Sequence, residues 1–230
     1  MRDRKSKDRV RGCLLAGAVG DALGAAIEFD SLAGIRAKHG SAGLTDYAPA
    51  YGRLGAITDD TQMLLFTAEG LLLALKNGNP IPKTVHQAYL RWLHTQGAPW
   101  DKRTMGERRG LVELAELHAS RAPGTTCTSA LQSGRMGTIA RPLNDSKGCG
   151  GIMRVAPVGL VDLPDPFQLG CELAAITHGH PSGYLPAGFM GSSSPIWSVA
   201  WICCRPSTVA RNGWRGSPIT TRPPRRFTRR

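Results

Sequence analysis

The sequence contains little of what secreted, zinc-binding or membrane proteins require. Its six cysteines include no Cys-x-x-Cys pair, which argues against a disulfide scaffold and against a structural zinc site. The apolar run over residues 13–20 is interrupted by Asp21, so it is at the short end for a signal peptide and too short to span a bilayer. We therefore expect a soluble, cytoplasmic protein whose thiols stay reduced.

The central part of the chain also lacks net charge. The formal charge of +12 belongs to the two ends, because residues 1–11 carry +4 and residues 191–230 carry +8. Residues 12–190 are therefore neutral and have no bulk attraction for nucleic acids or membranes. Neither class of partner is expected for the body of the protein.

The last part of the chain differs in composition from the rest. Residues 191–230 contain eight Arg but no Lys, Asp or Glu, together with five Pro and three of the five Trp. This difference predicts a folded domain over residues 1–190 and an irregular tail over residues 191–230. We interpret the tail as an aberrant end, such as the product of a shifted reading frame. The alternative is a disordered Arg-rich segment that binds nucleic acid.

Apolar residues recur at helical spacing through most of residues 1–190, and no segment alternates as a strand would. The best-marked helix starts at Thr58, a residue type that caps helices, and stops at Asn77 and Gly78. Further helices are expected over residues 83–96, 107–118, 125–136 (entered at Thr126 or Thr128), 152–161 and 166–177. The sequence predicts an all-α fold.

An N-terminal helix capped by Ser6 is expected to precede a loop that extends to residue 52. Gly17, Gly20 and Gly24 would weaken this helix, so their presence suggests that another backbone packs very close to it. In the same helix, Asp21 lies among small residues, and a buried carboxylate there needs a partner or a cation. Taken singly, it is more often a structural hydrogen-bonding group than a catalyst.

The start of the best-marked helix carries oxygen ligands. Thr58, Asp59 and Asp60 present a hydroxyl and two carboxylates in a row, and hard divalent cations prefer oxygen ligands. The alternative is that these residues only cap the helix and complement its dipole. Capping explains one aspartate well but does not require both.

Two further motifs suit an anionic ligand. Residues 146–151 form a glycine-rich loop before an expected helix, where backbone N–H groups can cradle a phosphate; a turn without a ligand is the alternative. Residues 177–181 read Thr-His-Gly-His-Pro. The two histidines suggest zinc, but no third ligand stands nearby in a recognised pattern, so the imidazoles could instead contact a ligand.

Taken together and in this order, these motifs resemble the ADP-ribosylglycohydrolase family. The matching stretches are residues 12–24, 58–63, 148–154 and 177–181, and the resemblance covers about residues 10–190. It implies an orthogonal multi-helix bundle with a dinuclear Mg²⁺ or Mn²⁺ centre. The implied activity is hydrolysis of the bond between ADP-ribose and a modified protein side chain or small molecule.

The resemblance also implies roles for individual residues. Thr58, Asp59 and Asp60 would be the N-terminal half of the metal site, and Glu28 would lie on a loop near the metals and position the substrate. The catalytic residues would be Asp60, which can accept a proton from water, and Glu28. The ADP-ribose contacts would come from Ser146, Gly148, Cys149, Gly150, Gly151 and His178.

One family feature is missing. Members carry a second motif, Asp-x-Asp-Thr, near the C-terminus, whereas this chain has no acidic residue after Glu172. The chain therefore resembles a truncated or frame-disrupted member, and we expect weak or no hydrolase activity because half the oxygen ligands are absent. The first alternative is a non-catalytic ADP-ribose-binding pseudoenzyme, and the second is a nucleic-acid binder that acts through its Arg-rich tail.

Overall fold

The computed structural model describes the backbone of residues 2–203 and the side chains of residues 7–193. Its helices are α1 (Arg2–Gly24), α2 (Leu32–His39), α3 (Asp59–Asn77), α4 (Ile81–Thr95), α5 (Lys102–Met105), α6 (Thr125–Gln132), α7 (Pro166–Ala175) and α8 (Pro181–Cys203). Its 3₁₀ helices are η1 (Gly110–Glu113), η2 (Ala115–Leu117), η3 (Cys149–Arg154) and η4 (Ala156–Leu160). Within this range the only strands are β1 (Pro49–Ala50) and β2 (Arg53–Leu54), an antiparallel pair. The prediction of an all-α fold is confirmed.

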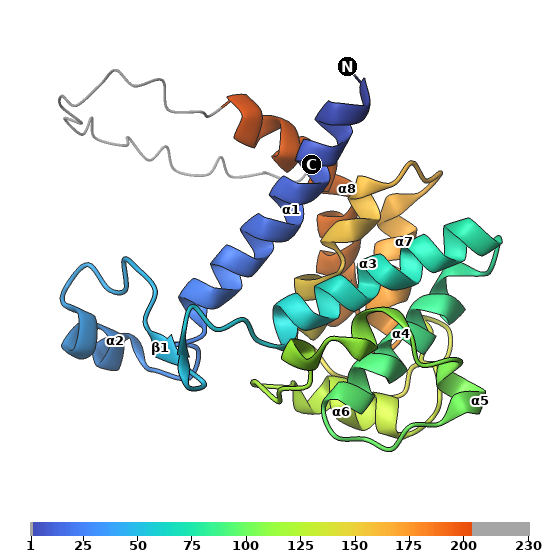
Figure 1. Cartoon of the computed structure of the whole chain (residues 1–230), viewed down its shortest axis with the longest axis horizontal. Helices are drawn as coiled ribbons and strands as arrows, with labels where there is room; N and C mark the ends of the chain where they lie inside the picture. The colour runs from blue at the N-terminus through green and yellow to red at the C-terminus, as the bar shows by residue number, and fades with distance from the viewer. Residues whose placement is uncertain (1, 204–230) are drawn as a thin grey trace, which may run out of the picture.

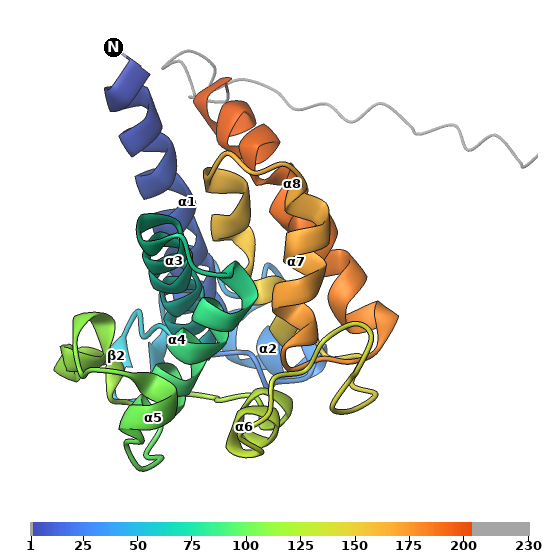
Figure 2. The same ribbon diagram turned by 90° about the vertical axis from the view of Figure 1, so that its right-hand side faces the viewer.

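The core lies between two helix pairs. Helix α3 packs along α4, and α7 packs along α8, with η3 and η4 between the pairs (Figures 1 and 2). Gly70 allows α3 and α4 to approach closely, because a Cβ there would lie 2.8 Å from the Cα of Val85. The largest buried side chains of this core include Phe66, Tyr89 and Trp92.

Helix α3 has the ends that the sequence predicts. The Thr58 hydroxyl accepts a hydrogen bond from the Asp60 N–H, and Gly78 ends the helix in the left-handed conformation at φ 66°. These local signals fix where the two aspartates stand relative to the first turn. The position of the carboxylates therefore follows directly from the sequence.

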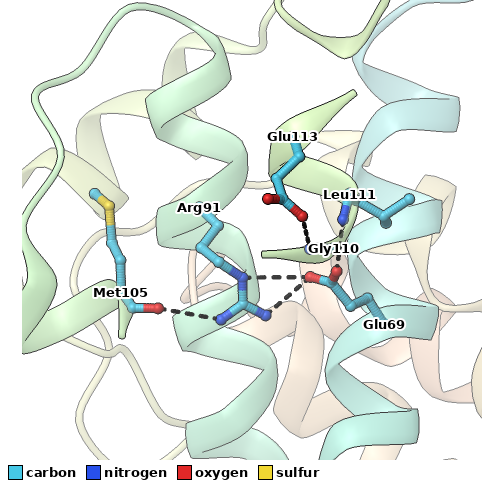
Figure 3. A network of polar contacts seen from close by, with 6 residues as sticks. All are labelled: Glu69, Arg91, Met105, Gly110, Leu111 and Glu113. Carbon is cyan, nitrogen blue, oxygen red and sulfur yellow. Dashed lines mark hydrogen bonds and ion pairs between the residues drawn. The ribbon is translucent and has the colours of Figure 1, made fainter. Parts of the chain in front are cut away.

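A polar network attaches η1 to the α3–α4 pair (Figure 3). Glu69 of α3 forms an ion pair of 2.9 Å with Arg91 of α4 and also accepts the Leu111 N–H at 2.9 Å. Arg91 in turn donates to the Met105 carbonyl, which ends α5. The ion pair is largely buried, so removing one partner would leave an uncompensated charge.

The predicted helices over 107–118 and 152–161 are wrong, because both stretches form successive 3₁₀ helices. In the first stretch Gly110 has φ 84° and Leu114 is extended, and both conformations interrupt an α-helix. The apolar spacing of three residues at Leu111, Leu114 and Leu117 matches the 3₁₀ period. In the second stretch Pro157 occupies the first turn of η4 and has no N–H to continue the preceding helix.

Three other predicted boundaries are also corrected. Helix α1 begins at Arg2 rather than being capped at Ser6, and α2 and strand β1 occupy part of the predicted loop before residue 52. Helix α6 begins at Thr125, directly after Gly124, and not at Thr126 or Thr128. The Thr128 hydroxyl does not cap the helix, since it donates to the carbonyls of the preceding turn. The helix ends at Gln132 rather than at residue 136. In Figure 1, α2 and the hairpin project away from the main helix body.

The glycines of α1 pack less closely than predicted. A Cβ at Gly17 would lie 3.4 Å from the Leu64 side chain of α3, but no described atom lies within 4 Å of a Cβ at Gly20 or Gly24. The expectation of a close backbone at all three glycines is therefore wrong for the described part of the chain. Leu15 and Val19 on the same helix are exposed.

Helix α8 continues across the predicted boundary at residue 190 and ends at Cys203. The remainder of the predicted tail, residues 204–230, lies outside the described residues. Between residues 2 and 203, no helix combines the length and hydropathy that crossing a bilayer requires.

Candidate functional site

Asp21 of α1 anchors the start of α3. Its carboxylate accepts the N–H and hydroxyl of Thr58 at 2.8 and 2.7 Å, and the N–H and hydroxyl of Thr61 at 3.1 and 2.5 Å. The expectation that a carboxylate at this position needs partners is confirmed, and its partners are neutral donors. Asp21 therefore holds two helices together and fixes the direction of the first turn of α3.

The two aspartates that follow Thr58 have different surroundings. Asp59 is 4% exposed, and its Oδ2 accepts the N–H of Gly124, the residue before α6, at 3.1 Å. Asp60 is half-buried, and its carboxylate has no hydrogen-bond or ion-pair partner among the described residues. Asp59 is therefore partly satisfied within the protein, whereas Asp60 remains free to bind something else.

Negative charge accumulates around these two side chains. Burial raises the pKa of Asp59 to about 7; the Gly124 N–H opposes this rise, and nearby carboxylates add to it. Burial also raises the pKa of Asp60 to about 6, with contributions from Asp21 and Glu28. Burial and the charge of Asp21 raise the pKa of Glu28 as well. The predicted site residue Glu28 thus lies within electrostatic reach of both aspartates.

This cluster fits a divalent cation only in part. Mg²⁺ or Mn²⁺ would use oxygen ligands such as the buried carboxylate of Asp59 and the half-buried carboxylate of Asp60. The Thr58 hydroxyl already donates to Asp21 and accepts from the Asp60 N–H, which leaves it one lone pair. Among the described residues, no group of three or more His, Cys, Asp or Glu side chains is arranged to hold a metal ion.

The glycine-rich loop is held by Asn144, a residue to which the sequence motifs assign no role. The Asn144 side-chain carbonyl accepts the N–H groups of Ser146 and Gly179 at 3.0 and 3.2 Å, and its amide donates to the Thr177 carbonyl at 2.8 Å. Asn144 therefore ties the loop to the segment that carries His178. Its position at the start of the loop, two residues before Ser146, is the sequence signal that could have identified it.

The predicted ligand residues of this loop lie close to His178. A Cβ at Gly148 would lie 3.3 Å from His178 Nε2, and one at Gly150 would lie 2.8 Å from His178 Cε1. Gly151 is buried against Ala174 of α7, whereas Cys149 is exposed. Only glycine fits at positions 150 and 151, because a side chain there would displace the imidazole ring or α7.

Ser146 and Thr126 connect the loop to α6. The Ser146 hydroxyl accepts the Gly148 N–H at 3.3 Å and lies 3.0 Å from the Thr126 hydroxyl. On the buried side of α6, the Cys127 sulfur lies 2.9 Å from where a Gly150 Cβ would be and 3.9 Å from a Gly124 Cβ. Since Gly124 also binds Asp59, the start of α6 links the carboxylate cluster to the glycine-rich loop.

His178 is buried, at 2% exposure, and does not pair with the second histidine of its motif. Its Nδ1 lies 2.8 Å from the Thr177 hydroxyl, whereas His180 accepts the Ser182 N–H. Burial lowers the pKa of His178 to about 4, and the Arg154 guanidinium contributes to this fall. His178 is therefore neutral near pH 7 and can act as a hydrogen-bond donor to a ligand.

Comparisons with known proteins agree with the resemblance. Residues 2–193 match the family model described as ADP-ribosylglycohydrolase. An uncharacterised protein of Archaeoglobus fulgidus is 33% identical over 163 residues, which cover 67% of this chain and 43% of that protein. The ADP-ribosyl-[dinitrogen reductase] glycohydrolase of Rhodospirillum rubrum is 31% identical over 180 residues, which cover 76% of this chain and 52% of that protein. The chain thus spans about half the length of these curated relatives, and no solved structure matches it.

Proposed function

Because this chain belongs to the ADP-ribosylglycohydrolase family, whose model covers residues 2–193, we propose that it carries one half of a divalent-metal-dependent site for hydrolysing an ADP-ribosyl bond. The observation that carries the proposal is Asp60. It is a half-buried carboxylate without a partner in the described chain, and it stands beside three other carboxylates and no described counter-ion. Such an accumulation is unfavourable unless a cation or a proton neutralises it.

In this proposal Thr58, Asp59 and Asp60 hold Mg²⁺ or Mn²⁺. The metal, when bound, would polarise the ribose and lower the pKa of a bound water. Asp60 is the group that accepts the water proton, because its carboxylate oxygens make no other hydrogen bond in the described part. Glu28, on the turn after α1, positions the acceptor side of the substrate.

The glycine-rich loop supplies the ADP-ribose contacts. Gly148 and Gly150 lie against the edge of the neutral His178 ring, and the Ser146 hydroxyl accepts the Gly148 N–H. Cys149 and Gly151 belong to the same loop, and in this proposal their backbone N–H groups also contact the ligand. Hydrogen-bond donors arranged in this way suit the diphosphate of ADP-ribose. Because Asn144 fixes this loop without help from the carboxylate cluster, binding does not require a complete metal site.

We further propose that hydrolysis by this chain is weak. All the candidate metal ligands come from the first turn of one helix, and Mg²⁺ loses its water shell only to a well-formed set of oxygen ligands. The second candidate function is therefore a non-catalytic ADP-ribose-binding protein, which the preformed loop favours. We also propose a cytoplasmic location, which the four described cysteines, all free, would suit.

One experiment separates the two functions. Calorimetric titration of the full chain with ADP-ribose, with and without Mg²⁺, measures binding, and release of ADP-ribose from an ADP-ribosylated protein measures turnover. Binding together with slow, Mg²⁺-dependent release that is lost in Asp60→Asn supports the hydrolase. Binding without release supports the binding protein. Absence of both binding and release in the wild-type chain would refute the proposed function.

A further inference from the structure

Arg154, at the end of η3, is a buried cation with no carboxylate partner among the described residues. Its side chain is fully buried, and every described polar contact that it makes is to a neutral group. Its Nη2 donates to the Leu173 carbonyl at 3.1 Å and to the Thr177 hydroxyl at 2.7 Å, and its Nη1 lies 3.4 Å from the Cys127 sulfur. The guanidinium also lies over the Tyr89 ring, 4.4 Å from its centre. A charge buried at this cost, and not needed for an ion pair, suggests a role in the neighbouring site.

The contact with Thr177 determines the direction of the next hydrogen bond. Because Arg154 can only donate, the Thr177 hydroxyl oxygen must accept from it. The hydroxyl proton then needs an acceptor, and the described choices are His178 Nδ1 at 2.8 Å and the Cys127 sulfur. Since sulfur is a weak acceptor, the imidazole nitrogen is preferred. The positive charge of Arg154 also favours this arrangement. It stabilises a lone pair, rather than an N–H group, on the Nδ1 atom of His178.

We propose that Arg154 and Thr177 are positioning residues that hold His178 in the tautomer with its proton on Nε2. The proton on the far nitrogen then points towards Gly148 and Gly150, whose missing Cβ atoms leave room for the ring edge. His178 thus presents a fixed donor beside Gly148 and Gly150 of the loop. This assignment rests on the proposed function only in taking an anionic ligand, the diphosphate of ADP-ribose, as what that donor recognises.

The tautomer can be measured without any ligand. Long-range ¹H–¹⁵N NMR of the full chain labelled at histidine shows which ring nitrogen carries the proton, and His178→Asn identifies the signals of His178. We expect Nε2–H in the wild type at pH 7. We expect a mixture or Nδ1–H in Thr177→Val, which keeps the shape but removes the hydroxyl, and Nε2–H again in Thr177→Ser, which restores it. Nδ1–H in the wild type, or an unchanged tautomer in Thr177→Val, would overturn the proposal, and the wild-type result decides even if the valine variant does not fold.

Titration with ADP-ribose then links the tautomer to recognition. Loss of one oriented hydrogen bond predicts binding about 5- to 10-fold weaker in Thr177→Val and within about twofold of wild type in Thr177→Ser. Equal affinity in the two variants, despite different tautomers, would contradict the recognition step. Failure of the wild type to bind ADP-ribose would count against the proposed function, while the NMR result would still decide whether Thr177 holds the tautomer of His178.

Discussion

Replacing Asp59 with asparagine should make the metal-free protein more stable at neutral pH. The carboxylate is almost fully buried, and burial raises its pKa from 3.8 to about 7. Ionising this group in the folded state is therefore unfavourable. Asparagine keeps the shape and the carbonyl oxygen that accepts the Gly124 N–H, so the substitution removes mainly the charge. Carboxylates near a helix N-terminus are usually stabilised by the helix dipole, but here desolvation outweighs that effect.

The sign and size of the effect follow from proton linkage. Between pH 4 and 7 the folded wild type retains a proton on Asp59 that the unfolded chain releases, so its stability falls as the pH rises through this window. Three pKa units at about 1.36 kcal/mol each give an upper limit of about 4 kcal/mol above pH 7. Because water and local relaxation reduce such penalties, we expect Asp59→Asn to be more stable by about 2–4 kcal/mol at pH 8 and nearly equal to wild type at pH 4.

Urea unfolding followed by far-UV circular dichroism, without divalent cations and at several pH values from 4 to 8.5, measures this difference. The matched control is Asp162→Asn, which removes an exposed carboxylate and should change stability by less than about 0.5 kcal/mol at every pH. A variant that is less stable than wild type at pH 8, or a stability difference that does not change with pH, would refute the reasoning about buried charge.

Four further predictions concern the scaffold and the cation. Asp21→Ala removes the acceptor for four hydrogen bonds at the start of α3 and should lower the free energy of unfolding by about 3 kcal/mol, as measured with urea; an effect below about 1 kcal/mol would contradict the anchoring role. Gly150→Ala should weaken ADP-ribose binding and destabilise the fold by about 1–3 kcal/mol, because its Cβ would meet His178 and Cys127. Gly20→Ala, at a position where the described structure leaves open space, should instead raise the free energy of unfolding by up to about 1 kcal/mol. Equal effects of Gly150→Ala and Gly20→Ala on this free energy would contradict the packing at position 150. Calorimetric Mg²⁺ affinity should increase from pH 5.5 to 8 with release of protons, because Asp60 titrates at about 6 and must lose its proton to bind; affinity independent of pH would argue that the cation binds elsewhere.

The parts of the fold that the sequence predicted well are those with local signals. Helix α3 could be placed from its cap, its first-turn aspartates and its terminal glycine, because each acts within one turn of the backbone. The 3₁₀ helices were expected to be α-helices, since apolar spacings of three or four residues do not separate the two when the segment is short. The hairpin and α2 were missed because a two-residue strand and an eight-residue helix give weak periodic signals.

The candidate site was predicted only as separate motifs. Sequence motifs identified Asp59, Asp60 and the glycine-rich loop, but not the contacts that join them. Those contacts run through Gly124, Asn144 and Arg154, whose roles depend on segments that meet only in the folded chain. In the sequence, Arg154 is only the last residue of the motif over residues 148–154. Its burial against Thr177 and Tyr89 is what indicates a role in positioning His178.

The most direct test of the central claim is a titration of the full chain with Mn²⁺ at pH 7.5. Binding is measured as the loss of the electron paramagnetic resonance signal of the free ion. The account predicts weak but saturable binding that disappears in Asp60→Asn and persists in Asp162→Asn. Binding that is the same in wild type and Asp60→Asn, or no binding by the wild type, would show that the carboxylates at the start of α3 do not form a cation site.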